Sequence, residues 1–528
     1  MQDEIDCSLL KSIWIVSREF NHIAEAGGVK NVVCSMAVNL QKIGVKTTVF
    51  IPLYKCTDLS AVRDFEKLDF SVDITVDGVV YNVEYASAFY GDVKIIFVMS
   101  KIFSSKRAVY VYTDEDTKEN PEFVKGIGHK DSFQMNSIFQ QSILFYGYKS
   151  EICPSLIHCH DAATAMVPVF ARNVFPFVRF FASTKFVVTI HNAGPGYLQS
   201  FSDITFAHRI TNLPENVLKK GRSFYSDSSV EPFLLASYYS HLTTVSPWYA
   251  EELYDTSNQF CLLARDFSQS GIKIEGITNG IDYDSYDPKN RDVSLLETVF
   301  SPCDGDFEGK RQLKNKFFEK INSCHDRLLG LECCGNFSEI DENTICFVYQ
   351  GRMVSQKGVE IFSDVADRML GENRNVCFLV HGQGQEYIEK IQEELASKYM
   401  GRYVYIKGYD RTLARNCVAS ADFLVLPSIF EPCCLEDFIA QIYGTIPIAH
   451  AVGGLNKIVN GETGFTYSNN TSSNLYIAML RASEILQSEP EKIKDIRILA
   501  AKTVKEKYSW ASIIKNKFLP YYKKILLD

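Results

Sequence analysis

The stretch that decides the fold is Pro-Ser-Ile-Phe-Glu-Pro-Cys-Cys-Leu at residues 427–435, followed by Gly-Gly-Leu at 453–455. Apolar segments at 422–426 and 445–449 precede these two stretches. Apolar runs of this length, separated by a helical segment, are typical of neighbouring parallel strands. Because ligands bind such sheets at the carboxyl ends of the strands, the sequence places Glu431 beside a diglycine turn that can hold a phosphate.

Both halves of the chain alternate strand-like apolar segments with segments of helical periodicity. In the first half, the predicted strands are 12–16, 46–51, 94–98, 156–159, 186–190 and 242–245. In the second half, they are 344–349, 376–380, 403–406, 422–426 and 445–449. This alternation predicts an α/β fold of two Rossmann-like domains, at 1–248 and 249–505. We expect a C-terminal helix at 506–528 to cross back to the first domain.

The composition excludes several classes of protein. With 528 residues the chain is too long for one hydrophobic core, which agrees with two domains. Its net charge of −9, without a basic block, argues against nucleic acid or an anionic membrane as the main partner. No apolar run has the length of a signal or membrane segment, and the 15 cysteines lack a CxxC spacing. We therefore expect a cytoplasmic protein without disulfides or a metal site.

Several short motifs follow one another in order along the chain. In the first half they are 17–33, 158–161 (His-Cys-His-Asp), 189–192 (Thr-Ile-His-Asn), 244–247 (Thr-Val-Ser-Pro) and 276–282. In the second half they are 351–358, 431–433, 453–455 and 463–465. With this order and spacing, the chain from about Ile13 to Tyr522 resembles the bacterial-type glycogen and starch synthases of glycosyltransferase family 5.

The resemblance implies a GT-B fold, in which two Rossmann-like domains face each other across a cleft that contains the active site. It also implies a retaining glycosyltransferase. Such an enzyme moves glucose from ADP-glucose, or less often UDP-glucose, to the non-reducing end of an α-1,4-glucan. It implies no metal ion and no other cofactor.

The reaction leaves negative charge on a departing diphosphate, which cationic side chains stabilise. Arg352 and Lys357 lie at a strand-to-helix turn, where the planar guanidinium of arginine and the compact ammonium of lysine suit this task. The alternative is that both are solvated side chains near a turn. By resemblance, Glu431 accepts hydrogen bonds from glucose hydroxyls, His191 lies under the donor sugar, and Asp131 faces the cleft. The alternatives are, respectively, a partner of the helix dipole, a core histidine and a helix N-cap.

Further motif residues are candidates for substrate binding. Glycines at strand ends permit a ligand to approach the backbone closely, and polar residues at such ends meet at one edge of the sheet. The candidates are Gly27, Gly28, His160, Asp161, Asn192, Asn279, Gly382, Gly384, Cys433, Leu435, Gly453, Gly454 and Leu455.

The chain departs from the family pattern near the expected site. Glu25 replaces a lysine of the first glycine loop, Ala162-Ala163 replace a Trp-His pair, Cys434 replaces a glycine, and Val452 replaces a threonine. These differences leave the donor nucleotide and the acceptor open. Two other functions stay in view: a catalytically weak glucan-binding or regulatory relative, and a transferase with another acceptor. The sequence gives no indication of the oligomeric state or of allosteric or redox control.

Overall fold

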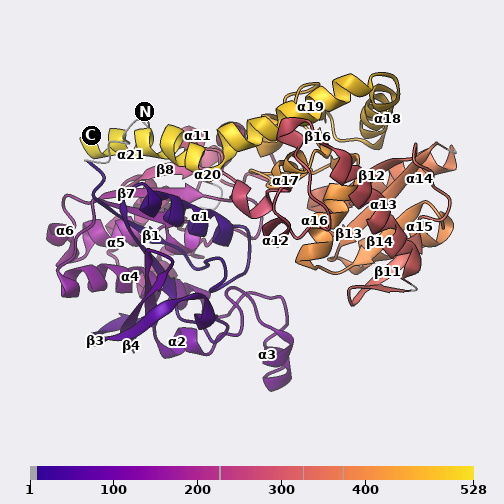
Figure 1. Cartoon of the computed structure of the whole chain (residues 1–528). Coiled ribbons are helices and arrows are strands. Elements are labelled where there is room, and N and C mark those ends of the chain that lie inside the picture. Colours follow the sequence, from indigo (N-terminus) through magenta and orange to yellow (C-terminus); the bar gives the residue numbers. More distant parts are fainter. Residues whose placement is uncertain (1–8, 225–227, 325, 373) are drawn as a thin grey trace. The chain divides into compact units, whose positions relative to one another are not determined.

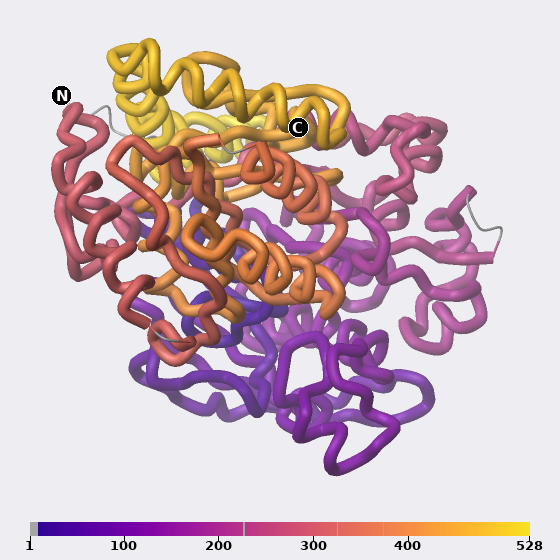
Figure 2. Tube along the Cα trace, turned by 90° about the vertical axis from the view of Figure 1, so that its right-hand side faces the viewer, coloured from indigo at the N-terminus to yellow at the C-terminus, as the bar shows by residue number. Residues whose placement is uncertain are grey.

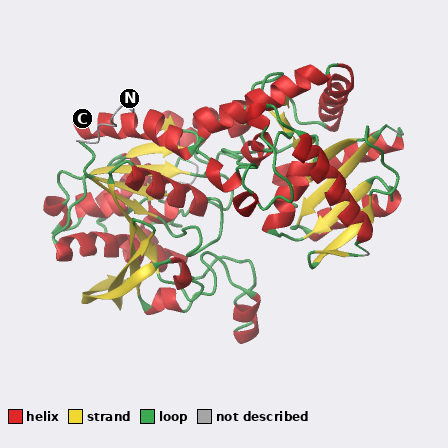
Figure 3. Ribbon diagram, in the orientation of Figure 1, coloured by secondary structure: helices red, strands yellow, loops and turns green. Residues whose placement is uncertain are grey.

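The chain forms two compact units, each with a sheet flanked by helices (Figure 3). The computed structural model describes residues 9–224, 228–324, 326–372 and 374–528. The first unit comprises Met1–Asn279 together with Trp510–Asp528, and the second comprises Gly280–Ser509. Both are α/β units with mostly parallel sheets, as the alternating sequence pattern predicts.

The sheet of the first unit has the strand order β3-β4-β5-β2-β1-β6-β7-β8-β9. Its strands are β1 (Ser12–Val16), β2 (Lys46–Pro52), β3 (Arg63–Val76), β4 (Val79–Tyr90), β5 (Val93–Met99), β6 (Leu156–His160), β7 (Lys185–Ile190), β8 (His241–Thr244) and β9 (Ile274–Gly276). From β1 the chain adds β2 and β5 on one side of the sheet, and it then adds β6 and β7 on the other side. The topological switch point therefore lies between β1 and β6. All six strands predicted in this half are present.

The antiparallel pair β3 and β4 is absent from the prediction. The sequence of β3 alternates apolar and polar residues, a pattern typical of a strand with one face in water, and in the structure Val72, Ile74 and Val76 are buried while the residues between them are exposed. The turn is Asp77-Gly78, with φ of 53° and 74°. Two successive residues with positive φ form a type I′ turn, for which Asp-Gly is a favoured sequence.

The helices of the first unit connect and cover these strands (Figure 1). Helix α1 buries Val32, Val33, Met36 and Leu40, the apolar positions at helical spacing. The helices are α1 (Val29–Lys42), α2 (Lys101–Ser104), α3 (Asp114–Glu119), α4 (Ser132–Ser150), α5 (Val167–Asn173), α6 (Phe177–Phe180), α7 (Ile204–Thr211), α8 (Glu215–Leu218), α9 (Pro232–Ser237), α10 (Pro247–Glu252) and α11 (Ala264–Ser270).

The sheet of the second unit has the strand order β10-β11-β14-β13-β12-β15-β16-β17. Its strands are β10 (Arg327–Leu328), β11 (Leu331–Asn336), β12 (Ile345–Gln350), β13 (Val376–Gly382), β14 (Tyr403–Lys407), β15 (Phe423–Leu426), β16 (Ile446–His450) and β17 (Phe465–Tyr467). The five predicted strands are present and parallel, and their switch point lies between β12 and β15. The short strands β10, β11 and β17 are not in the prediction.

Two hydrophobic cores cover the two faces of this second sheet. Alternate residues of β12 and β13 face opposite sides, so Val348 and Leu379 lie in one core, whereas Phe347 and Val380 lie in the other. The helices are α12 (Arg291–Ser294), α13 (Glu308–Ser323), α14 (Val359–Gly371), α15 (Glu386–Lys398), α16 (Arg411–Ser420), α17 (Glu436–Ile442), α18 (Ser472–Ser488) and α19 (Pro490–Thr503). Helices α18 and α19 pack against each other (Figure 2).

The last segment of the chain belongs to the first unit. After the π-helical turn η8 (Val504–Tyr508), the chain continues through α20 (Trp510–Ile513), the π-helical turn η9 (Ile514–Phe518) and α21 (Leu519–Leu527), which pack beside α1 (Figure 1). The Tyr522 hydroxyl bonds to His158 Nδ1 at 2.7 Å, which ties α21 to β6.

Two further features of the architecture bear on the sequence-based expectations. The first unit extends to Asn279 rather than to residue 248, because β9 pairs with β8. Among the described residues, no helix combines the length and apolar content that crossing a membrane requires.

Candidate functional site

The turn after β12 carries the two predicted cationic residues. The chain passes through the short helix η6 (Ser355–Lys357) into α14, and Gly358 between them has φ of 66°. A Cβ atom at Gly358 would lie 1.9 Å from the Pro427 carbonyl oxygen, so only glycine fits. The Ile429 amide donates to the Gln356 carbonyl at 2.9 Å. This turn is therefore packed directly on the segment that leads to Glu431.

Lys357 and Glu431 form an ion pair between the two strand-end segments. The Lys357 ammonium bonds to Glu431 Oε2, and the side chains are 23% and 10% exposed, respectively. Burial alone lowers the pKa of Lys357, but the Glu431 carboxylate opposes it and the net pKa is raised. Ser428 Oγ also donates to Glu431 Oε2, at 3.3 Å. Because α17 begins only at Glu436, Glu431 is not simply a helix-dipole partner.

Arg352 lies on the same turn as Lys357 and its side chain is exposed. Its carbonyl accepts hydrogen bonds from the Tyr349 hydroxyl at 2.9 Å and from the Val354 amide at 3.0 Å, which fix the backbone beneath it. A guanidinium on a fixed backbone beside a partly buried ammonium can bind a phosphate group through two parallel hydrogen bonds.

Glu436, which the sequence-based prediction missed, adds a second carboxylate to this cluster. Gln350, the last residue of β12, donates from Nε2 to Glu436 Oε2 at 3.1 Å. Burial raises the pKa of Glu436 to about 7, although the positive charge of Lys357 opposes the shift. Its position five residues after Glu431, at the first residue of α17, was the available signal.

The predicted glycines of this unit shape loops through close backbone contacts. A Cβ at Gly382 would lie 1.9 Å from the Gly351 carbonyl oxygen, and one at Gly384 would lie 2.3 Å from that of Met353. The Met353 amide also donates to the Gln383 carbonyl at 2.9 Å. Gly382 and Gly384 therefore hold the loop after β13 against the loop that carries Arg352.

The diglycine loop after β16 packs on the Glu431 segment. The Gly454 amide donates to the Glu431 carbonyl at 2.8 Å, and a Cβ at Gly454 would lie 2.3 Å from Cys433 Cα. Gly453 has φ of 45°. Of the other candidates here, Leu455 is fully buried in the core, so its side chain anchors the loop and does not point to a ligand. The Cys433 side chain is buried, and Leu435 packs partly buried against the same core.

In the first unit, Asp161 and His191 meet at the carboxyl ends of β6 and β7. Asp161 Oδ1 accepts a hydrogen bond from the His191 amide at 2.8 Å. Asp161 has φ of 64° and ψ of 173°, a strained conformation for a residue other than glycine, and such strain clusters at functional sites. Burial raises the pKa of Asp161 to about 7.

Three histidines form a buried group behind this point. His160 Nδ1 lies 2.9 Å from His191 Nε2, and the His158 ring stacks on that of His160 with centroids 4.5 Å apart. His158 Nε2 bonds to Thr189 Oγ1 at 2.6 Å. Burial lowers the pKa of His191 to about 3, so its imidazole is neutral at pH 7. It can exchange hydrogen bonds but cannot supply a positive charge.

The first glycine loop surrounds a buried carboxylate, Glu19. Its Oε2 accepts a hydrogen bond from the Gly27 amide at 2.6 Å, and burial raises its pKa despite this bond. A Cβ at Gly28 would meet no atom within 4 Å, so packing does not require a glycine there. Glu25 pairs with Lys30 at 2.7 Å, so the charge of Lys30 is engaged by its neighbour.

The remaining candidates of the first unit have defined partners. Asp131 occupies the N-cap position of α4 but makes no side-chain cap hydrogen bond; it pairs instead with Lys106 at 2.7 Å. Asn192 Oδ1 accepts from the Gly194 amide at 2.7 Å. Asn279 is buried at the end of the first unit, and its amide donates to the Val245 carbonyl at 3.3 Å.

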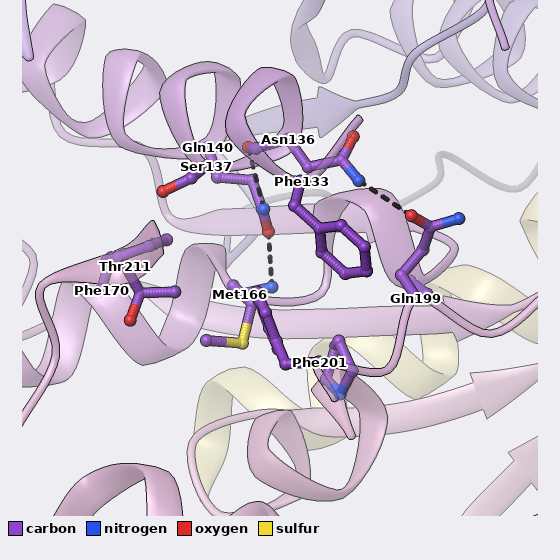
Figure 4. A pocket seen from close by; sticks show the side chains of 11 residues that line it. Phe133, Asn136, Ser137, Gln140, Met166, Phe170, Gln199, Phe201 and Thr211 are labelled. Carbon is purple, nitrogen blue, oxygen red and sulfur yellow. Dashed lines mark hydrogen bonds between the residues drawn. The ribbon is translucent and has the colours of Figure 1, made fainter. Parts of the chain in front are cut away.

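A small cavity lies beneath α4 (Figure 4). Asn136 Nδ2 donates to Gln199 Oε1 at 3.2 Å, and Gln140 Oε1 accepts from the Met166 amide at 2.6 Å on its wall. Its volume is about 10 Å³, room for a single water and too little for a sugar. In the described part of the chain, no three His, Cys, Asp or Glu side chains are grouped to hold a metal ion.

Comparisons with known proteins agree with this architecture. Residues 12–267 match the starch synthase catalytic domain, and residues 344–484 match the glycosyl transferases group 1. The chain is 28% identical to the glycogen synthase of Thermodesulfovibrio yellowstonii, over 97% of each chain. It is 25% identical to that of Alkaliphilus metalliredigens, over 97% of this chain and 99% of the other.

Solved structures extend the likeness to three dimensions. The catalytic domain of starch synthase IV from Arabidopsis thaliana, bound to ADP and acarbose, has a TM-score of 0.79 and 25% identity, covering 98% of this chain and 100% of that one. Sucrose-phosphate synthase from Thermosynechococcus elongatus shares the fold, with a TM-score of 0.56 and 16% identity over 98% and 99% of the two chains. The GT-B fold predicted from the sequence is confirmed. The chain belongs to the glycogen and starch synthase family, glycosyltransferase family 5, as a divergent member.

Proposed function

We propose that this protein transfers glucose, with retention of configuration, from ADP-glucose to the non-reducing end of an α-1,4-glucan. The observation that carries the proposal is the partly buried Lys357–Glu431 pair beside the exposed Arg352, at the switch point of the second unit. The family supports this choice, and its structural relative starch synthase IV was solved with ADP and acarbose. UDP-glucose is the alternative donor.

Charge on the leaving diphosphate is the main electrostatic demand of the reaction. As the bond from the glucose to the diphosphate breaks, negative charge grows on the phosphate oxygens. Arg352 supplies a fork of donors, and Lys357 supplies an ammonium with three donors, one of which serves Glu431. Lys357 therefore has donors left for a phosphate while it stays paired with Glu431.

Glu431 and His191 have the properties that binding a sugar requires. The Glu431 carboxylate is fixed by Lys357 and Ser428, and its remaining lone pairs can accept hydrogen bonds from glucose hydroxyls. A carboxylate near the ring also stabilises the positive charge that the sugar acquires in the transition state. His191 is neutral and its amide is held by Asp161, so it acts as a positioned hydrogen-bonding group.

One observation favours a second candidate, a catalytically weak glucan-binding relative. Glu25 stands where the family has a lysine, and it pairs with Lys30. In this alternative, glucan binding is kept while turnover is lost.

The test is glucose transfer to glycogen by the purified protein, with ADP-glucose and UDP-glucose assayed side by side. We expect transfer from ADP-glucose, and a loss of at least 100-fold in kcat/KM for Glu431→Ala. Asp422→Asn is the matched control, because Asp422 pairs with Lys314 at 2.8 Å at the amino end of β15, away from the strand ends that carry Glu431. This variant loses stability but keeps turnover per folded molecule. Glycogen binding without transfer from either donor would favour the second candidate.

A further inference from the structure

A buried lysine lies between the two loops that the proposed donor site requires. Lys457 is the last residue of η7 (Gly453–Lys457), and its side chain is 1% exposed. Burying an ammonium costs several kcal/mol unless the charge is paired and its hydrogens are bonded. The contacts of Lys457 therefore indicate what keeps it there.

Main-chain carbonyl groups from both loops surround the Lys457 ammonium. Nζ donates to the carbonyl oxygens of Cys433 at 2.5 Å, Cys434 at 3.2 Å and Gly454 at 3.1 Å. The first two belong to the acid loop, which we define as Glu431–Leu435, and the third belongs to the diglycine loop, Val452–Leu455. One charged atom thus fixes the backbone of both loops at once.

A carboxylate in α17 completes the surroundings of the ammonium. Asp437 Oδ1 lies 2.9 Å from Lys457 Nζ, and Asp437 is fully buried. The Phe438 ring lies 4.5 Å from Nζ, where its π face favours a cation. Burial alone lowers the pKa of Lys457, but the Asp437 carboxylate raises it above its usual value. The ammonium is therefore charged, and it acts as an internal cation for the two loops.

The acid loop needs such a support because its backbone is strained. Cys434 has φ of 63°, in the left-handed region that costs a residue with a Cβ about 1–2 kcal/mol. Its carbonyl and that of Cys433 are two of the oxygens bound by Lys457. Cys434 follows Glu431 by three residues, so relaxation of Cys434 would displace the segment that positions the Glu431 carboxylate.

We propose that Lys457 is a positioning residue for the transfer reaction, which holds the acid loop and the diglycine loop together in the conformation that binds the donor's diphosphate and glucose. This role rests on the proposed function of Glu431 and Lys357. It acts through the backbone, since the ammonium is buried beneath the loops and does not reach a ligand itself.

The test compares ADP binding by calorimetry among matched variants. Lys457→Met alone leaves Asp437 unpaired and endangers folding, so the main variant is Asp437→Asn/Lys457→Met, which removes both charges. Lys310→Met is the control, because Lys310 is equally buried and donates to the Ala419 carbonyl and Thr445 Oγ1, both at 2.7 Å, which lie outside the two loops. Maltoheptaose binding and thermal unfolding are measured on the same samples.

We expect the double variant to bind ADP at least tenfold more weakly and maltoheptaose unchanged, with the Lys310→Met variant within twofold of the unaltered protein for ADP. Adding Cys434→Gly to the double variant should recover most of the ADP affinity, because glycine adopts positive φ without strain. A general loss of stability would weaken maltoheptaose binding as well. A loss confined to ADP, together with its recovery when Cys434→Gly is added, therefore separates positioning from simple structural support.

Two results would overturn the role of Lys457. The first is tight ADP binding by the unaltered protein together with an equal affinity in the double variant. The second is an equal loss of ADP affinity in Lys310→Met. If the unaltered protein binds neither ADP nor UDP, the proposed function and the role of Lys457 fall together.

Discussion

Binding of ADP should weaken as the pH rises through 7, because Glu436 then gains a negative charge. Its carboxyl accepts a hydrogen bond from Gln350 and senses the charge of Lys357, so it belongs to the cluster that we propose binds the diphosphate. Burial raises its pKa to about 7, so the carboxyl is neutral below this pH and ionised above it. An ionised carboxylate beside a diphosphate is repulsive.

The size of the effect follows from this pKa. If only the neutral form of Glu436 admits ADP, the apparent Kd scales as one plus ten raised to the difference between the pH and a pKa of about 7. Between pH 6 and pH 8 the Kd then rises about tenfold, which corresponds to about 1.4 kcal/mol of binding free energy. This is the upper limit, reached when the charged form excludes ADP completely.

Glu436→Gln supplies the matched control, since glutamine keeps an oxygen to accept from Gln350 and carries no charge. ADP itself gains negative charge near pH 6, which favours binding to Arg352 and Lys357 at higher pH. The pH dependence of ADP binding by the variant gives this contribution of ADP alone, and the difference between the two proteins gives the contribution of Glu436. Calorimetric titrations at pH 6, 7 and 8 measure the Kd of ADP for both proteins. Parallel pH profiles in the two proteins would refute the reasoning.

Three other perturbations have defined outcomes. Burial raises the pKa of Glu231 from 4.5 to about 7, so the stability that this group contributes is full below pH 4.5 and is lost as the pH rises through 7. Between pH 4.5 and pH 8, the unfolding free energy of Glu231→Gln, measured in urea, should therefore rise by about 3 kcal/mol relative to that of the unaltered protein. Tyr522→Phe leaves His158 Nδ1 without its hydroxyl partner and should lower the unfolding free energy by about 1–3 kcal/mol, with faster hydrogen exchange in β6 as the readout. Gly382→Ala puts a methyl group against the Gly351 carbonyl and should cost about 1–3 kcal/mol in urea unfolding and also weaken ADP binding.

The central strands of both sheets could be predicted because they are buried on both faces. Continuous apolar runs such as 186–190 and 423–426 are sufficient to identify them. The β3–β4 hairpin was missed because one face of it is solvated, so that apolar and polar residues alternate along β3 and form no continuous apolar run. Its Asp77-Gly78 turn was the signal that should have been read.

Within the candidate site, the sequence indicated which side chains gather, and the structure shows how they are held. Arg352, Lys357 and Glu431 follow from motif position and strand ends. The buried residues around them could not be predicted in this way. Lys457 binds carbonyl oxygens of a loop more than twenty positions away, and every residue type has such a carbonyl, so the sequence does not indicate the contact. Asp131 shows the same limit, because its N-cap position suggested a local partner and its ion pair is with Lys106.

The return of Trp510–Asp528 to the first unit sets the order in which the protein can be assembled during synthesis. When Asn279 leaves the ribosome, β6 still lacks the helix whose tyrosine bonds to His158, so the first unit stays incomplete. The second unit, Gly280–Ser509, is continuous and can close before the first is finished. At about 5–20 residues per second, the nascent first unit waits roughly 10–50 s with part of its apolar surface uncovered. Chaperones that shield nascent chains would therefore act on the N-terminal unit, although it is made first.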